Sequence, residues 1–301
     1  MVEGIVFLIE HGSLEENTQV QQLRQLHKQY TAGVSTQDAL QYALDLNKKG
    51  YRAVLSCLGE RTESPTAAKK KTSLYRDLLQ AISDRQLDAS ISVKLSDLGL
   101  RQSISLAKKN LEDLLTRAQE TDRIVEIDME YRSLVQPTID IALQMLRQGF
   151  QFRLAIQSGL RTAIPLASQL LHTARRSNGN IGFRIVTGSC YSCNQDGYST
   201  TLETSEAQTI AQFYLLLDLA LWWRRKGGLW SAVGSRNLDR IVYASQYDFE
   251  IQLLKGEEQT KAFFVADDEL QKEGCVRLAF YVGFGSLDDE GVKAYLLRRI
   301  Q

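Results

Sequence analysis

The 301-residue chain has no excess of either charge, because 36 lysines and arginines stand against 36 aspartates and glutamates. Proteins that neutralise many phosphates usually carry a basic excess, so this balance argues against nucleic acid as the main partner. Cysteine is also scarce, with four residues in the whole chain. That number is too small for the disulfide framework of small secreted domains, and it favours a reducing compartment.

Long apolar runs are missing as well. The most apolar internal segment, residues 213–223, contains Asp218 and is shorter than the roughly 20 apolar residues that a membrane span needs. Residues 5–9 are apolar but lack the basic flank and cleavage site of a secretion signal. We therefore expect a cytoplasmic protein. Packing on a barrel is the simplest use of segment 213–223, and peripheral contact with a membrane surface is the alternative.

Eight short runs of β-branched and aliphatic residues alternate, for the most part, with segments of helical periodicity. The runs are residues 52–59, 91–96, 124–130, 152–158, 183–188, 231–235, 249–254 and 276–283, and the main helical segments are 74–83, 103–119, 137–149, 163–176 and 206–226. A helical crossover returns each strand parallel to the last. The order predicts an α/β fold, most economically a closed, TIM-like (β/α)8 barrel, with an open doubly wound sheet as the alternative.

The first 50 residues differ from the rest in composition, and they contain two segments that read as helices without a strand between them. Segments 14–30 and 36–48 are rich in Gln, Leu, Ala and Lys, and Ser35 or Thr36 is a suitable cap for the second. We therefore divide the chain into an N-terminal helical arm, residues 1–50, and a barrel domain, residues 51–301. In such a barrel, functional residues lie at the carboxyl ends of the strands.

Polar side chains occur at those predicted strand ends. Lys94 lies inside an apolar run, Asp128 and Gln157 come near the ends of two others, and Arg184 lies within a fourth. Burying an ionisable group is costly unless it is paired or used. Lys94 and Asp128 are therefore either a structural ion pair or parts of a site, and the recurrence on successive strands favours a site.

Arg298 and Arg299 end an apparent helix that begins with acidic residues at 288–290. Bases at a helix C-terminus interact favourably with the helix dipole, which is the simpler explanation. The functional alternative is a carboxylate clamp, since guanidinium groups bind two planar oxygens by charge-assisted hydrogen bonds.

Several other motifs are absent or incomplete. Cys190 and Cys193 have the CxxC spacing, but there is no second such pair and only three histidines, so no metal site is predicted. Gly283 and Gly285 lack the third glycine of a dinucleotide-binding loop, and no GxxxxGK[ST] phosphate loop occurs. No histidine falls at a predicted strand end, which argues against a Ser-His-Asp hydrolase.

Six further segments occur in a characteristic order, namely residues 92–99, 127–130, 156–157, 184–188, 249–256 and 295–299. Together they resemble the flavin-dependent proline dehydrogenase family. The resemblance implies a distorted (β/α)8 barrel that binds FAD at its C-terminal face beneath a last helix. It also implies oxidation of L-proline to 1-pyrroline-5-carboxylate by hydride transfer to flavin N5, with electrons passed to a quinone or similar acceptor. A downstream pyrroline-carboxylate dehydrogenase is a further implied partner.

The resemblance also implies roles for individual residues. Lys94, Arg298 and Arg299 would bind the substrate carboxylate, Asp128 would lie near the reacting amine, and Tyr281 would pack on the substrate ring. Relatives that prefer hydroxyproline tend to have a smaller residue at that position, so Tyr281 points to proline itself. Glu250 would support the site.

Cofactor contacts are implied in the same way. Arg184 would lie near the flavin N5 edge and so belong to the catalytic set with Asp128. The remaining implied cofactor-binding residues are Met129, Gln157, Thr187, Gly188, Ser189, Ser235 and Arg236. The chain departs from the family pattern at Thr187, where the family has a lysine, and at Arg236, where it has a histidine.

Two alternatives stay open on the sequence. The altered segments around Cys190 and residues 263–264 suit a flavoenzyme that acts on another proline-like imino acid in a biosynthetic pathway. Thr187 and Arg236 suit a catalytically silent barrel that keeps a carboxylate-binding pocket. Turnover of proline analogues distinguishes the first alternative, and proline binding without flavin distinguishes the second.

Overall fold

The computed structural model describes residues 14–59, 62–188, 204–271 and 277–299. Ser189 and the cysteine pair Cys190 and Cys193 lie outside these residues. The strands are β1 (Arg52–Cys57), β2 (Ala89–Val93), β3 (Val125–Ile127), β4 (Gln151–Gln157), β5 (Asn180–Val186), β6 (Ser231–Gly234), β7 (Phe249–Leu254) and β8 (Arg277–Phe284). The helices are α2 (Leu14–Tyr30), α3 (Thr36–Asn47), α4 (Pro65–Asp84), α5 (Ile104–Glu120), α6 (Arg132–Arg147), α7 (Ala163–Arg175), α8 (Glu206–Arg224), α9 (Leu238–Ser245), α10 (Lys261–Gln271) and α11 (Glu290–Leu297).

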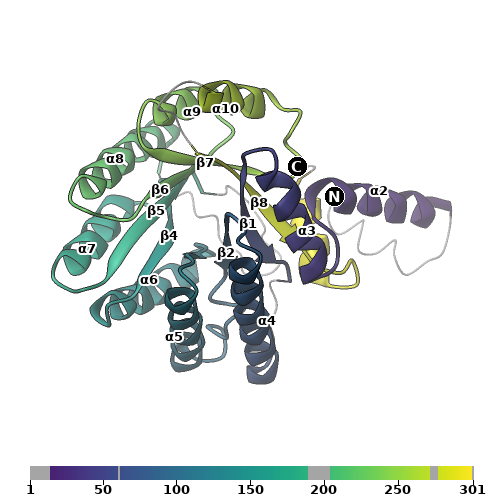
Figure 1. The fold of residues 1–301 in the computed structure, drawn as a ribbon, viewed down its shortest axis with the longest axis horizontal. Helices are drawn as coiled ribbons and strands as arrows, with labels where there is room; N and C mark the ends of the chain where they lie inside the picture. Colours follow the sequence, from purple (N-terminus) through teal and green to yellow (C-terminus); the bar gives the residue numbers. More distant parts are fainter. Residues whose placement is uncertain (1–13, 60–61, 189–203, 272–276, 300–301) are drawn as a thin grey trace.

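The eight strands form one closed, parallel barrel in sequence order. Closure is made by β1 and β8, which pair from Arg52 with Ala279 to Cys57 with Phe284. Helices surround the barrel, as Figure 1 shows. The predicted α/β barrel is therefore confirmed, and the open-sheet alternative is wrong.

Each strand presents two different faces, because side chains alternate along a strand with a period of two. On β2, Ile91 and Val93 join the hydrophobic core beneath the helices, whereas Ser90 and Ser92 hydrogen-bond to carboxylates inside the barrel. On β3 the core residues are Val125 and Ile127. Hydrocarbon therefore lies outside the sheet, and the barrel interior is largely polar.

Two helices begin earlier than the sequence pattern predicts. The N-cap of α4 is Ser64, whose side chain accepts from Ala67 N, and Pro65 occupies the first turn, where its missing N–H costs nothing. Pro137 lies inside α6 rather than at its start. It leaves one carbonyl of the preceding turn without its helical donor, a cost that the long buried face of α6 outweighs.

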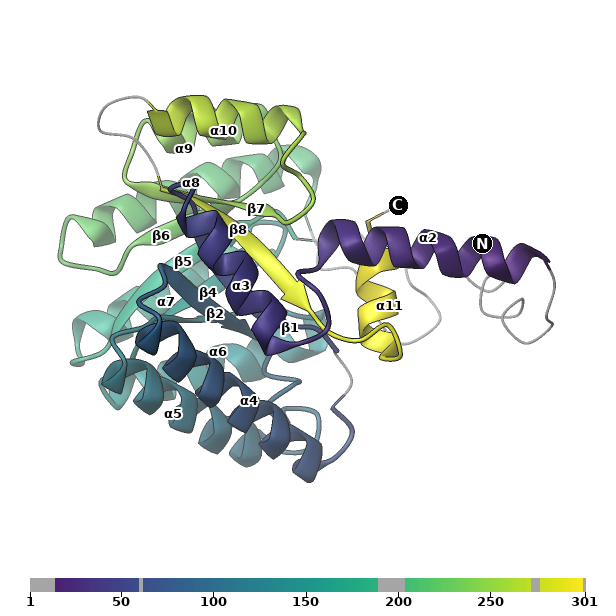
Figure 2. The same ribbon diagram turned by 45° about the vertical axis from the view of Figure 1, so that its right-hand side comes forward.

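The N-terminal helices hold the barrel in two places. α3 packs against β1 and β8, with Ala39, Leu40 and Ala43 buried in the main core. α2 packs against α11, as Figure 2 shows, and His27 Nε2 lies 2.7 Å from Gly285 O. The boundary at residue 50 stays a prediction. In the described part of the chain, no helix combines the length and apolarity needed to cross a bilayer.

Candidate active site

A cavity of about 330 Å³ lies at the carboxyl ends of the strands. It brings together all six residues that the sequence suggested for substrate binding and catalysis. They are Lys94, Asp128, Arg184, Tyr281, Arg298 and Arg299. They come from the ends of β2 and β3, from β5 and β8, and from the end of α11. The rim that a (β/α)8 barrel uses for chemistry is thus charged and hollow rather than packed with hydrocarbon.

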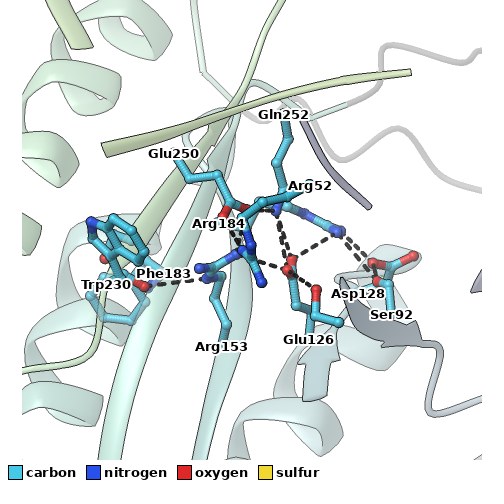
Figure 3. Close-up of polar contacts among 12 residues, drawn as sticks. Arg52, Ser92, Glu126, Asp128, Arg153, Phe183, Arg184, Trp230, Glu250 and Gln252 are labelled. Carbon is cyan, nitrogen blue, oxygen red and sulfur yellow. Dashed lines mark hydrogen bonds and ion pairs between the residues drawn. The ribbon is translucent and has the colours of Figure 1, made fainter. Parts of the chain in front are cut away.

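Asp128 is contacted by several side chains of this site, and Figure 3 shows it beside Ser92 and Arg184. Its Oδ1 accepts from Ser92 Oγ at 2.5 Å and from Arg184 Nη2. Its Oδ2 accepts from Tyr281 OH at 2.9 Å and lies 3.2 Å from Lys94 Nζ. Its backbone N–H donates to Val93 O at 2.8 Å, which holds Asp128 beside the end of β2. Four side chains thus hold one carboxylate.

Charge dominates the protonation of the group. Burial alone would raise the pKa of Asp128, but the neighbouring Arg184 and Lys94 charges outweigh burial and hold that pKa far below its usual range. The pKa of Arg184 is raised, since Asp128 and Glu126 outweigh its own desolvation. Burial, reinforced by the Asp128 charge, raises the pKa of Tyr281 to about 12. At neutral pH the site therefore contains an ionised carboxylate and a protonated phenol.

A second polar layer lies deeper in the barrel. Arg153 Nη1 donates to Glu126 Oε1 at 2.7 Å and to Glu250 Oε1 at 2.9 Å, and Arg52 also pairs with Glu250. Gln252 Nε2 lies 3.1 Å from both Glu126 oxygens. This network, shown in Figure 3, leaves few buried charges without a partner.

The deep layer is connected to the site through Arg184, and its member Gln252 also lines the cavity. Arg184 Nη1 lies 3.6 Å from Glu126 Oε2, while the other side of its guanidinium group bonds to Asp128. The sequence suggested Glu250 as a supporting residue, but Glu126 and Arg153 were missed. The sequence signal that could have found them is a charged residue at every second position of an otherwise buried strand.

The arginine pair closes the cavity from the side of α11. Arg298 is the C-cap of that helix. Arg299 Nε donates to Tyr295 O at 3.4 Å, and its guanidinium lies 4.5 Å from the centre of the Tyr295 ring. Helix α11 packs against α2, and Tyr295 and Leu296 belong to the hydrophobic cluster between these helices, so a packed element presents the arginine pair.

A second cavity of about 490 Å³ adjoins the first. Its lining contains Gln157, Thr187, Gly188, Ser235 and Arg236, all of them expected at the cofactor from the sequence. The other expected residues differ. Met129 packs its side chain on the hydrophobic core and offers its carbonyl oxygen to Gln157 Nε2 at 3.5 Å, and Ser189 lies outside the described residues.

Arg240 is a lining residue of this cavity that the sequence analysis missed. Its Nη1 donates to Thr187 Oγ1 at 2.5 Å. A guanidinium therefore contacts Thr187, the residue that replaces the lysine of the family pattern. Arg236, which replaces the family histidine, lies 3.4 Å from Glu257 Oε1 and is mostly exposed.

The hydroxyl of Tyr281 gives a first test of the site. Tyr281→Phe removes the donor to Asp128 Oδ2 and keeps the ring, so we expect catalytic efficiency with the substrate to fall about tenfold, the usual value of one hydrogen bond to a charged group. Tyr247→Phe, at an exposed tyrosine of the α9–β7 turn, is the matched control. An unchanged kcat/KM in Tyr281→Phe would show that this bond does not contribute.

The fold and the cavity define a (β/α)8-barrel protein with a charged ligand site at the carboxyl ends of its strands. A family model described as proline dehydrogenase matches residues 39–301. The chain belongs to the proline dehydrogenase family and is an oxidoreductase. Proline dehydrogenase 1 of Bacillus subtilis (strain 168) is 26% identical over 304 residues, which cover 98% of this chain and 92% of that relative. Its counterpart in Bacillus subtilis subsp. natto is 27% identical with the same coverage.

Solved structures agree on the fold. Proline utilization A (PutA) from Bdellovibrio bacteriovorus, inactivated by N-propargylglycine, superposes with a TM-score of 0.77 at 19% identity. A D778Y mutant of Bradyrhizobium japonicum PutA gives 0.73 at 20% identity. The alignments cover 92% and 91% of this chain but only 32% and 30% of those chains. The chain thus spans about a third of these larger proteins.

Proposed function

We propose that this protein oxidises L-proline to 1-pyrroline-5-carboxylate with FAD as cofactor and passes the electrons to a quinone or a similar acceptor. The observation that carries the proposal is the convergence of Lys94, Arg298 and Arg299 around Asp128 in one cavity. A cavity of about 330 Å³ is of the size that small ligands occupy.

The charges of the cavity complement those of proline, which carries a carboxylate and a secondary ammonium. Lys94 and the arginine pair supply positive charge for the carboxylate. Asp128 supplies the negative charge for the ring nitrogen. A zwitterion held at both ends has a fixed orientation, and such positioning accounts for a large part of enzymatic rate enhancement.

The low pKa of Asp128 bears on its role. A carboxylate whose pKa is held far below its usual range is a weak base, so it accepts a proton poorly at neutral pH. Asp128 therefore orients the amine and holds Lys94, Arg184 and Tyr281 in place. Under this proposal, the proton of the ring nitrogen leaves to water.

The second cavity fits a flavin. Gln157 contributes a buried Oε1 with no hydrogen-bond partner among the described residues, an acceptor suited to a ring N–H of a ligand. Arg236 and Arg240 suit the anionic part of a flavin nucleotide. When bound, FAD would supply the oxidant for the ring carbon that adjoins the proline nitrogen on the side away from the carboxylate.

The absorption spectrum tests the proposal. We expect the purified protein to be yellow and its flavin band to bleach when proline is added anaerobically. Hydroxyproline, pipecolate and a proline ester serve as comparison substrates. Protein that is colourless and takes up no FAD contradicts the proposal, and faster bleaching by another imino acid assigns the site to that substrate instead.

A further inference from the structure

The second cavity carries positive charge that its described lining does not balance. Three arginines line it, Arg236, Arg240 and Arg299, and the other lining residues that the structure describes are neutral. Arg236 lies near the carboxylate of Glu257, which stands outside this cavity lining. Within the described residues, Arg240 forms no ion pair. An arginine that lines a hollow and has no carboxylate partner among the described residues is suited to bind an anion.

Arg240 is held in a defined position. The N-cap Asn237 accepts from Arg240 N at 3.1 Å, so the residue lies in the first turn of α9. The guanidinium lies 4.6 Å from the centre of the buried Phe213 ring, and Thr187 Oγ1 accepts one of its N–H groups. A guanidinium has five N–H donors, so most of them remain for a ligand.

The two cavities share part of their walls. Val186, Gly234, Ser235, Arg236 and Arg299 line both. One elongated ligand can therefore occupy both spaces, with an aromatic part at one end and an anionic part at the other. A flavin nucleotide has this shape and charge, whereas riboflavin has the same ring and no phosphate.

We propose that Arg240 is a cofactor-binding residue that recognises a phosphate group of the flavin nucleotide, with Thr187 holding its guanidinium in position. This inference rests on the proposed function, since it assumes that the second cavity holds a flavin. It assigns to α9 a role in selecting phosphorylated flavins over riboflavin.

The test is the affinity of the flavin-free protein for FAD, FMN and riboflavin, measured by quenching of flavin fluorescence. Arg240→Met keeps the side-chain stem on Phe213 and removes the charge. We expect it to weaken FAD and FMN binding about ten- to a hundredfold, the range for one charge-assisted contact, and riboflavin binding less than about twofold. Arg240→Lys, which keeps the charge but loses the fork, is expected to lie between.

Arg175→Met, at an exposed arginine in the last turn of α7, is the matched control and should leave all three affinities unchanged. Should Arg240→Met fail to fold, Thr187→Val removes the hydroxyl that holds the guanidinium, and a smaller loss confined to FAD and FMN is expected.

The inference is overturned if Arg240→Met binds FAD and FMN as tightly as the wild type does. It is also overturned if the affinity for riboflavin falls as much as the affinities for FAD and FMN. Failure of the proposed function gives a different result, because the wild-type protein would then bind none of the three flavins.

Discussion

Asp128→Asn should reduce kcat/KM for proline by about 10²–10³-fold, the loss typical of removing one preorganised electrostatic group from an active site. The substitution keeps the shape of the side chain but removes the charge that Lys94 and Arg184 both contact. These two cations then repel each other, and the amine of the substrate loses its counter-charge. Steady-state kinetics with proline, at matched flavin content, measures the effect.

The control for this variant is Asp122→Asn. Asp122 is exposed and has a φ of 51°, a conformation that asparagine tolerates, so its activity should equal that of the wild type. Circular dichroism should show both variants folded. A folded Asp128→Asn that retains more than about a tenth of the wild-type kcat/KM would refute the central role given to this carboxylate.

Glu250→Ala should lower the free energy of unfolding by about 3–5 kcal/mol, the range found when one partner of a buried ion pair is removed. The Glu250 side chain is fully buried and contacts both Arg52 and Arg153. Its loss leaves these arginines in the barrel interior with fewer counter-charges. Denaturant unfolding measures the change, and Glu63→Ala, at an exposed loop residue, is the control. A loss below about 1 kcal/mol, the value of an exposed pair, would contradict the account.

The stability lost in Glu250→Ala should depend on pH. Burial opposes ionisation of Glu250, but Arg153 and Arg52 outweigh it and lower its pKa below the unfolded value of about 4.3. A group with a depressed native pKa stabilises the fold above its unfolded pKa, and this contribution is lost as pH falls through the native value. The difference in free energy of unfolding between wild type and Glu250→Ala should therefore be largest near neutral pH and should decrease below about pH 4.

The strands were predictable because their core-facing positions carry a strong signal. Most bounds agree within about two residues, and β7 agrees at both ends. β3 is shorter than predicted because its ladder ends at Ile127. Beyond it, Asp128 turns into the site and Glu130 accepts from Ser96 N rather than continuing a strand. Helices α9 and α10 were missed, since eight and eleven residues give little periodic signal.

The site was predictable only in part. The sequence shows a charged residue in a buried strand, but not which other charge it meets, because that depends on the barrel register. Glu126 and Arg153 meet because β3 and β4 pair at these two residues. Arg240, in the first turn of α9, meets Thr187, which follows β5. The resemblance to the family suggested the substrate-binding residues, which stay a prediction. It did not suggest Arg240, because the family segments that carry the resemblance do not include this residue.

Above all, we propose that Lys94, Arg298 and Arg299 bind one substrate carboxylate beside Asp128. A crystal structure of the flavin-loaded protein with a proline analogue tests it most directly. The account predicts the analogue's carboxylate within hydrogen-bond distance of Lys94 and of Arg298 or Arg299, with its ring nitrogen toward Asp128. An analogue whose carboxylate contacts none of these three cations, or which lies at the other end of the barrel, would contradict it.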